Sequence, residues 1–286
     1  DQKGLSEPSR YDLPGPTFYY ELEWDPDGSH VLFTDANRTI WTLNVESGET
    51  TKVDTDPYAT PERAIDPAWS PDGEWIAYSK RLDNGHNAVM LYSLATGETG
   101  RVATKLVETR HPTWSADGDY LYFLGSINKG LDTGWLDMSS YGRPTTYGLY
   151  AAVLSAEGTS PLLPRSDEAA TAGSGDEAAT QNGSDMPEVT VDRAGLADRI
   201  VSLGVEKGIY SQLRAGPDGT LFYVSQPALN GRPSLERYSF EERGSSTFME
   251  GVQQFTLSHD RSQLLYQSGG TWGVVPTSGS PSVGDG

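Results

Sequence analysis

The chain has 286 residues, of which 10% are aromatic, with 32 glycines, 18 prolines and a formal net charge of −19. This charge argues against nucleic acid and anionic membrane surfaces as partners, because both bind clusters of lysine and arginine. The chain has no cysteine, which excludes disulfides, cysteine-ligated zinc and thiol catalysis.

The N-terminal segment, residues 1–16, is polar and contains neither an initiator methionine nor the apolar stretch of a signal peptide. We therefore expect a chain cut from a longer one. No run of about 18 apolar residues occurs, so a membrane-spanning helix is not expected. Only six of the 21 basic residues are lysines, which is typical of salt-adapted proteins and equally of an ordinary acidic, soluble protein. The compartment stays open between cytoplasm and periplasm.

One short motif recurs along residues 17–286 and determines the predicted architecture. It starts as Trp24-Asp25-Pro26-Asp27-Gly28, returns at Trp69 and Trp114, 45 positions apart, and appears in weaker form at 216–219 and 258–261. Short apolar runs flank each copy, and Asp-Gly supplies the positive φ angles of a tight hairpin turn. Each copy therefore predicts a strand, a turn and a strand. The turn residues with a predicted structural role are Asp27, Gly28, Asp72, Gly73, Asp117, Gly118, Asp218 and Gly219.

A second hairpin follows each motif. Residues 41–45 alternate between apolar and polar and lead into a turn at Ser47-Gly48, and the second copy repeats this pattern. In the third copy we expect strands at 149–154 and 160–163. Two hairpins in about 45 residues give the period and strand count of a propeller blade, which buries its faces only by stacking on neighbouring blades.

The predicted fold is all-β: a β-propeller with about five four-stranded antiparallel blades. We place these blades at 17–62, 63–107, 108–165, 187–228 and 229–277. Propellers have about four to eight blades, so five are enough to close a ring. The cut N-terminus favours instead a larger propeller of six or seven blades, with the others N-terminal to this chain.

Two segments break the repeat. Residues 126–148 form a long insertion in the third blade, which either carries function or packs on a neighbouring blade. Within it, Asp137, Arg143 and Tyr147 are candidates for a substrate channel or its mouth, where an arginine would hold a peptide carboxylate or carbonyl. The alternative is a buried Arg143 paired with Asp137. Residues 166–186 are acidic and rich in Ala, Gly and Ser, which predicts a disordered loop between blades.

The chain offers no catalytic constellation. A serine peptidase needs a nucleophile, a nearby base and an oxyanion hole, yet no Gly-x-Ser-x-Gly motif occurs and the four histidines have no companion motif. Their spacing fits no metal site, and residues 25–28 lack the remaining ligands of a calcium loop. We expect no catalytic residue, metal or cofactor in this chain, and a structural role for the histidines.

The repeat resembles the blades shared by TolB and the tricorn proteases, and the segments that break the repeat make the resemblance more specific. They look like tricorn-type proteins of bacteria at 17–20, 51–58, 91–97, 135–141, 160–168 and 191–200. On these residues the chain is similar to the second propeller of a tricorn-type serine protease. The likeness covers nearly the whole chain apart from its first dozen residues and the acidic loop.

The resemblance implies a place in a larger protein, in which propellers precede a PDZ domain and a peptidase domain that holds the catalytic serine. The implied function is a non-catalytic gate that admits and filters unfolded peptides. The implied partners are those peptides, the downstream domains of the same polypeptide and further copies in a homo-oligomer. Two alternatives stay open: an interaction propeller of the TolB or dipeptidyl-peptidase type, and a lectin-like domain, although no binding residue repeats in every blade.

Overall fold

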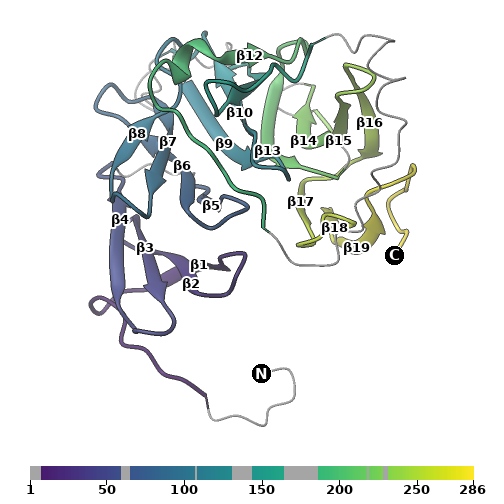
Figure 1. The fold of residues 1–286 in the computed structure, drawn as a ribbon. Helices are drawn as coiled ribbons and strands as arrows, with labels where there is room; N and C mark the ends of the chain where they lie inside the picture. Colours follow the sequence, from purple (N-terminus) through teal and green to yellow (C-terminus); the bar gives the residue numbers. More distant parts are fainter. Residues whose placement is uncertain are drawn as a thin grey trace, which may run out of the picture. The chain divides into compact units, whose positions relative to one another are not determined.

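The structure is a computed structural model in which residues 8–58, 65–106, 108–130, 144–163, 186–217, 219–227 and 231–286 are described (Figure 1). The chain divides into two compact units, Asp1–Arg63 and Ala64–Gly286. Regular structure in the described ranges is β-strand apart from one 3₁₀ turn, η3 (Leu196–Asp198). Those ranges contain no helix with the length and apolar character needed to cross a membrane.

The first unit is one antiparallel sheet in the order β1-β2-β3-β4. Its core contains Val31, Phe33 and Leu43, and Tyr19 packs edge-on against Phe33 at 5.6 Å between ring centres. The Tyr11 hydroxyl donates to the Val45 carbonyl, which fixes the N-terminal segment on the sheet. The strands are β1 (Tyr19–Trp24), β2 (His30–Asp35), β3 (Thr39–Asn44) and β4 (Thr50–Thr55).

The second unit begins with the sheet β5-β6-β7-β8, again in chain order and antiparallel. The first strand is short because Pro67 precedes it and has no N–H to add to the ladder. The sheet confirms the predicted pair of hairpins in the second copy of the repeat. Its strands are β5 (Ala68–Trp69), β6 (Trp75–Arg81), β7 (Asn87–Ser93) and β8 (Thr99–Arg101).

The third sheet corrects the prediction for the third blade. Residues 160–163, expected as its last strand, form a turn in which the Leu163 N–H donates to the Ser160 carbonyl. Pro161 and Pro164 leave this segment short of the N–H groups that a ladder needs. The outer strand comes instead from far along the chain. The strands are β9 (Glu108–Trp114), β10 (Tyr120–Ser126), β11 (Gly148–Val153) and β12 (Ile200–Ser202).

This shift moves the next blade along the chain. The fourth sheet spans 209–250 rather than 187–228, since residues up to Ser202 belong to the third sheet. Its strands are β13 (Ile209–Ala215), β14 (Thr220–Gln226), β15 (Ser234–Ser239) and β16 (Gly244–Glu250). The fifth sheet has three described strands: β17 (Gln254–Leu257), β18 (Gln263–Ser268) and β19 (Thr271–Pro276).

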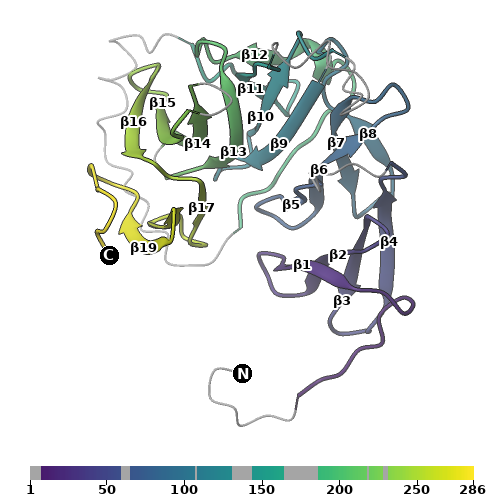
Figure 2. The same cartoon turned by 180° about the vertical axis from the view of Figure 1, so that it is seen from behind.

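Consecutive sheets of the second unit stack face to face, as the two views of Figures 1 and 2 show. One core cluster joins Leu91 of β7 to Leu121 of β10. A second joins the third sheet to Leu213 of β13, and a third joins Phe222 of β14 to Phe255 of β17. Each sheet thereby buries apolar faces that it could not bury alone. The chain is an all-β fold of antiparallel propeller blades, as the repeat predicts.

The fifth sheet keeps one apolar face open to solvent. Trp272 and Val274 of β19 are 57% and 50% exposed, and Leu265 of β18 is 37% exposed. Gly273 and Val275, which alternate with these residues along β19, are buried on the opposite face. An exposed patch of three neighbouring large apolar side chains is unusual on the surface of a folded domain.

Candidate functional site

The hairpin between the first two strands of a sheet closes through a serine and an aspartate. Ser70 Oγ donates to Asp72 Oδ1 (2.5 Å) and accepts the backbone N–H five residues further on (2.9 Å). Gly73 has a φ of +76°, whereas Asp72 does not adopt the left-handed region. The prediction that Asp-Gly supplies positive φ angles is therefore correct for the glycine alone. The arrangement recurs at 115–118 and, with Arg261 in the glycine position, at 258–261.

The remaining predicted turn residues lie in equivalent turns. Asp27 Oδ1 accepts the Ser29 N–H (2.7 Å), and Gly28 has a φ of +77°. Gly118 and Gly219 have φ values of +77° and +65°. Asp218 lies outside the described residues. A structural role for the eight turn positions stays a prediction.

The segment that follows the acidic loop crosses two of these turns. The Val189 N–H donates to Asp72 Oδ2 (2.9 Å), and the Val189 side chain packs against Gly118, where an added Cβ would lie 2.5 Å from Cγ2. Further along, the Arg193 guanidinium donates to the Glu98 carbonyl and lies over the Trp75 ring. The turns of the second and third sheets are thus joined by a strap, residues 186–199, that leads into β12.

A strained backbone recurs at one position of the repeat, three residues before the last residue of the first strand in the first four sheets. Glu21, Asp66, His111 and Gln212 have φ values of +55°, +38°, +53° and +55°. The ladder shifts register there in β1, β9 and β13. Non-glycine residues with positive φ cost about 1–3 kcal/mol each and persist where surrounding contacts hold them. All four side chains are polar, so the bulge presents a polar group at the same place in successive blades.

The bulge residues of the second unit connect neighbouring blades. His111 Nδ1 lies 2.6 Å from Asp66 Oδ2, which joins the third sheet to the second. Gln212 donates through Nε2 to the Gln253 carbonyl (2.8 Å) and accepts the Phe255 N–H through Oε1 (3.3 Å), which joins the fourth sheet to the fifth. In both cases the positive-φ residue of one first strand contacts residues in or beside the first strand of a neighbouring sheet.

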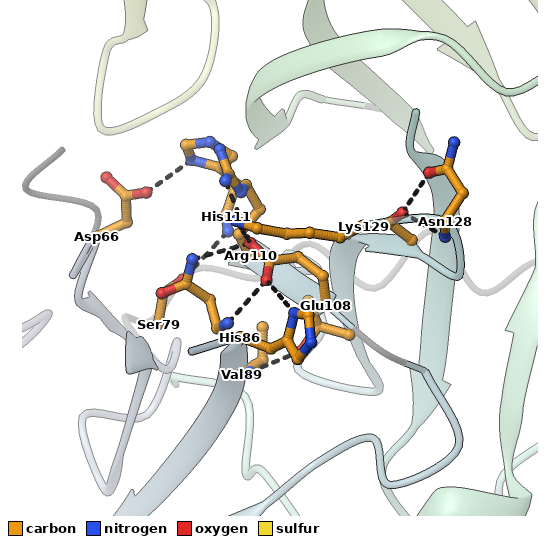
Figure 3. Close-up of polar contacts among 12 residues, drawn as sticks. Asp66, Ser79, His86, Val89, Glu108, Arg110, His111, Asn128 and Lys129 are labelled. Atoms are coloured by element: carbon orange, nitrogen blue, oxygen red, sulfur yellow. Dashed lines mark hydrogen bonds and ion pairs between the residues drawn. The ribbon is translucent and has the colours of Figure 1, made fainter. Parts of the chain in front are cut away.

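Glu108 lies at the start of β9 and is completely buried, at the centre of the polar cluster in Figure 3. Its carboxylate accepts the backbone N–H and the side-chain amide of Asn87, both at 2.8 Å. Lys129 Nζ lies 3.0 Å away and the Arg110 guanidinium 3.1 Å away, while His86 Nδ1 is at 3.8 Å. One buried carboxylate therefore connects the β6–β7 turn of the second blade to two cations of the third.

The surroundings keep both carboxylates of this junction ionised. Burial raises the pKa of Glu108, but the charge of Lys129, the hydrogen bonds from Asn87 and the charge of Arg110 outweigh it, so its pKa lies below the ordinary value. Burial likewise raises the pKa of Asp66, and the contact with His111, with Arg214 and Arg110 nearby, lowers it further than burial raises it. The junction between the second and third blades is thus an ionic network inside the fold.

Tyr147, expected at a channel, lies within this region but its side chain is 4% exposed. Its ring packs under the Arg110 guanidinium, 4.9 Å from ring centre to Cζ, and its backbone pairs with Gly208. Arg143 and Asp137, the other two predicted channel residues, lie outside the described residues. A channel role for the three stays a prediction, and within the described residues Arg110 is the arginine that contacts Tyr147.

Three of the four histidines make local polar contacts. His30 lies 3.1 Å from Asp25 Oδ2 and 3.1 Å from Asn44 Nδ2, and His86 and His111 belong to the junction above. Within the described ranges no group of three or more His, Cys, Asp or Glu side chains is placed to hold a metal ion. Ser29 Oγ lies 2.8 Å from His30 Nδ1 and donates to Asp25 Oδ2 (2.8 Å), all within one hairpin turn. The arrangement can hold neighbouring strands together and offer hydrogen-bonding groups.

Sequence reasoning missed Glu108 and the bulges. A polar residue three positions before the motif tryptophan, as in Glu21, Asp66 and His111, is the signal that would have identified the bulge position. Pro67 and Pro112 directly follow two of them and mark an interruption of the ladder. Glu108 carries no such local signal, because its partners come from a different blade.

The stacked antiparallel blades with inter-blade contacts on their first strands define the class of this protein as a β-propeller domain. The model of the tricorn protease second beta propeller domain matches residues 14–277, and the chain belongs to that family. It is 24% identical over 249 residues to a tricorn protease homolog of Saccharolobus solfataricus, and 26% identical over 269 residues to tricorn protease homolog 1 of Streptomyces coelicolor.

These alignments cover 84% and 88% of this chain but 21% and 24% of the relatives, so the chain spans about a fifth to a quarter of their length. Among solved structures, the tricorn protease matches with a TM-score of 0.69 at 17% identity over 93% of this chain and 26% of that chain. TolB from Acinetobacter baumannii matches with a TM-score of 0.56 at 12% identity over 91% of this chain and 52% of that chain. At these identities the structural likeness defines the fold.

Proposed function

We propose that this chain is a non-catalytic β-propeller of a tricorn-type serine peptidase and that it controls the access of unfolded peptides to a catalytic domain of the same polypeptide. The observation that carries the proposal is the family match over residues 14–277, to a domain of a protease. Its curated relatives are named tricorn protease homologs and are about four to five times longer than the aligned region, which leaves room for catalytic domains.

The geometry of the first strands supports a gating role. The contacts of Asp66 with His111 and of Gln212 with the fifth sheet hold these strands at fixed positions. Carboxylate, imidazole and amide groups can pair with peptide N–H and C=O groups of any sequence. A passage walled by such strands would accept an extended chain and reject a folded domain, because rigid, packed sheets do not widen continuously.

The open face of the fifth sheet supports a propeller larger than the five described sheets. Leu265, Trp272 and Val274 form an exposed apolar patch of the kind that the other sheets bury against a neighbouring blade. We infer that a neighbouring blade covers it, as in the stacked sheets of a propeller.

The proposal is tested with two proteins: this chain alone, and the longer polypeptide that contains it. Each is incubated with an unfolded, dye-quenched protein substrate, and cleavage is followed by fluorescence and mass spectrometry. We expect cleavage by the longer polypeptide and none by this chain. Peptidase activity of the isolated chain, or a parent polypeptide without a peptidase domain, would overturn the assignment.

A TolB-like interaction propeller is the second candidate function. TolB of Alcanivorax borkumensis is 38% identical, but only over 60 residues, or 21% of this chain. That length corresponds to little more than one repeat, so it reflects the shared blade. The sequence downstream of Gly286 in the parent gene separates the two candidates, because the peptidase proposal requires a catalytic domain in that polypeptide.

A further inference from the structure

A cavity of about 790 Å³ opens between the third and fourth sheets, where β13 begins and β14 ends. Its lining includes Pro144, Ile209, Tyr210 and Ser225. This volume falls in the range of about 300–1,000 Å³ that is typical of ligand pockets. The cavity lies at the end of the blades where the second strand leads to the third, which is also the end from which the 126–148 insertion emerges.

The wall on the side of the insertion is held in place by hydrogen bonds. The Tyr147 N–H donates to the Gly208 carbonyl (2.7 Å) and the Gly208 N–H donates back (3.1 Å), and this pair forms an isolated bridge. The Thr146 N–H donates to Asn128 Oδ1 (3.0 Å), which ties the same segment to the end of β10. Both contacts are made within the chain, so this wall is formed before any ligand arrives.

The floor of the cavity, at Tyr210, is also held in place by contacts within the chain. The Tyr210 hydroxyl donates to the Glu206 carbonyl (2.6 Å), and the Tyr210 ring packs edge-on against Tyr223 with ring centres 4.8 Å apart. Tyr223 in turn donates to Ser245 Oγ (2.8 Å). Gly208 must be a glycine in this arrangement, because an added Cβ would lie 2.5 Å from the Tyr210 ring. The ring is therefore presented to the cavity in one orientation.

The chemistry of the lining favours a neutral, partly apolar ligand. Pro144, Ile209, Tyr210 and Pro227 supply apolar surface, and Ser225 supplies an uncharged hydroxyl. Among the described lining residues, the charged ones are Glu206 and Lys207, whose opposite charges cancel. The chain as a whole has a net charge of −19, whereas the charges of the described lining residues cancel. An extended polypeptide therefore meets little electrostatic repulsion at this cavity.

We propose that this cavity is a docking site for unfolded polypeptide, which places one large apolar side chain against Tyr210 and Ile209 while its main chain runs over the hydroxyl and amide groups at the rim. The proposal rests on the proposed function and names where the substrate is first captured. A large apolar side chain is the feature that unfolded chains expose and folded ones bury.

The test measures binding of short fluorescein-labelled peptides to this chain by fluorescence anisotropy. Two capped heptapeptides of Gly and Ser are compared, one with a central Phe and one with a central Ala. The variant Ser225→Phe fills the cavity from β14, and Ser246→Phe places the same side chain at an exposed position of β16 in the same blade as a matched control. Thermal melting monitors the fold of both variants.

We expect the Phe peptide to bind about ten-fold more tightly than the Ala peptide, since burial of one large apolar side chain contributes at least that much. Ser225→Phe should weaken binding of the Phe peptide about ten-fold or more, and Ser246→Phe should leave it unchanged. Equal binding of the two peptides, or wild-type affinity in Ser225→Phe, overturns the docking site. If Ser225→Phe lowers the melting temperature, Thr146→Phe repeats the test from the opposite wall. A failed docking site with intact peptidase activity of the parent polypeptide would leave the proposed function standing.

Discussion

His111 Nδ1 lies 2.6 Å from Asp66 Oδ2, and this contact joins β9 to the segment just before β5, at two positions that both have positive φ. Glu108 makes a second connection across the same junction, to Asn87. A polar junction between otherwise apolar sheets fixes their register, because its partners are satisfied in one arrangement only.

Acid should weaken the junction between the second and third blades. The pKa values of Asp66 and Glu108 are both lowered in the folded protein, so their contribution to stability is complete above the ordinary carboxyl pKa and is lost as the pH falls through the lowered value. We expect the free energy of unfolding in urea to fall between about pH 5 and pH 3.

The control for this acid effect is a double variant, Asp66→Asn with Glu108→Gln. Protonation of other acidic residues also relieves repulsion in a chain of net charge −19, but it does so alike in both proteins. The double variant should therefore lose less stability than the wild type over the same pH range. Parallel pH profiles would contradict the role of these two carboxylates.

Removal of the buried charge at Glu108 should be costly at neutral pH. Glu108→Gln removes the buried carboxylate that contacts Lys129 and Arg110, whose side chains are both 13% exposed. We expect a loss of about 3 kcal/mol in the free energy of unfolding. Glu157→Gln, at an exposed turn position, is the matched control and should change stability by less than about 0.5 kcal/mol. Equal effects of the two changes would show that Glu108 is not buried in a network.

Gly118 should be less tolerant of a side chain than other turn glycines. Gly118→Ala adds strain at a φ of +77° and a collision with Val189 Cγ2 at 2.5 Å. Gly97→Ala has similar strain, at a φ of +68°, but its nearest neighbour is 3.9 Å away. We expect about 1 kcal/mol lost at Gly97 and at least about 2 kcal/mol at Gly118. Equal losses in thermal or urea unfolding would show that residues 186–199 do not pack on the turn.

The pKa of Asp260 tests the geometry of the serine–aspartate turn at residues 258–261. Hydrogen bonds from Ser258, and then from the side chain and backbone of Ser262, lower the pKa of Asp260 to about 2. A titration of the aspartate carboxyl carbons by NMR should show that value in the wild type. Ser258→Ala should raise it most, Ser262→Ala less, and Ser246→Ala not at all. An ordinary pKa for Asp260 in the wild type would contradict the turn geometry.

The hairpins were predictable from the sequence because their determinants are local. The Trp69–Gly73 motif carries its turn serine, aspartate and glycine within five residues, and the flanking apolar runs define both strands. The copy at 258–261 folds the same way even though arginine replaces glycine, since the Ser258–Asp260 pair is kept. The repeat also gave the all-β class and the stacking of successive sheets.

The strand composition of the third blade was not predictable from the local sequence. β11 ends at Val153 and its partner β12 begins at Ile200, so the local sequence does not identify the pairing. Residues 160–163 have the apolar composition of a strand. Pro161 and the adjacent Pro164 lack the N–H groups that a strand ladder needs, and composition alone does not show this. The cavity at Tyr210 was missed for a related reason, because its walls come from segments more than 60 residues apart that meet at the Tyr147–Gly208 bridge.

The most direct test of the account follows this chain in contact with an unfolded substrate. A reduced, carboxymethylated protein is mixed with the purified chain, association is measured by light scattering or anisotropy, and the substrate mass is measured over hours. We expect the substrate to associate in its unfolded form and to keep its intact mass, while the same protein in its folded form does not associate. Cleavage of the substrate, or equal association of the folded form, would contradict a non-catalytic propeller that selects unfolded peptides.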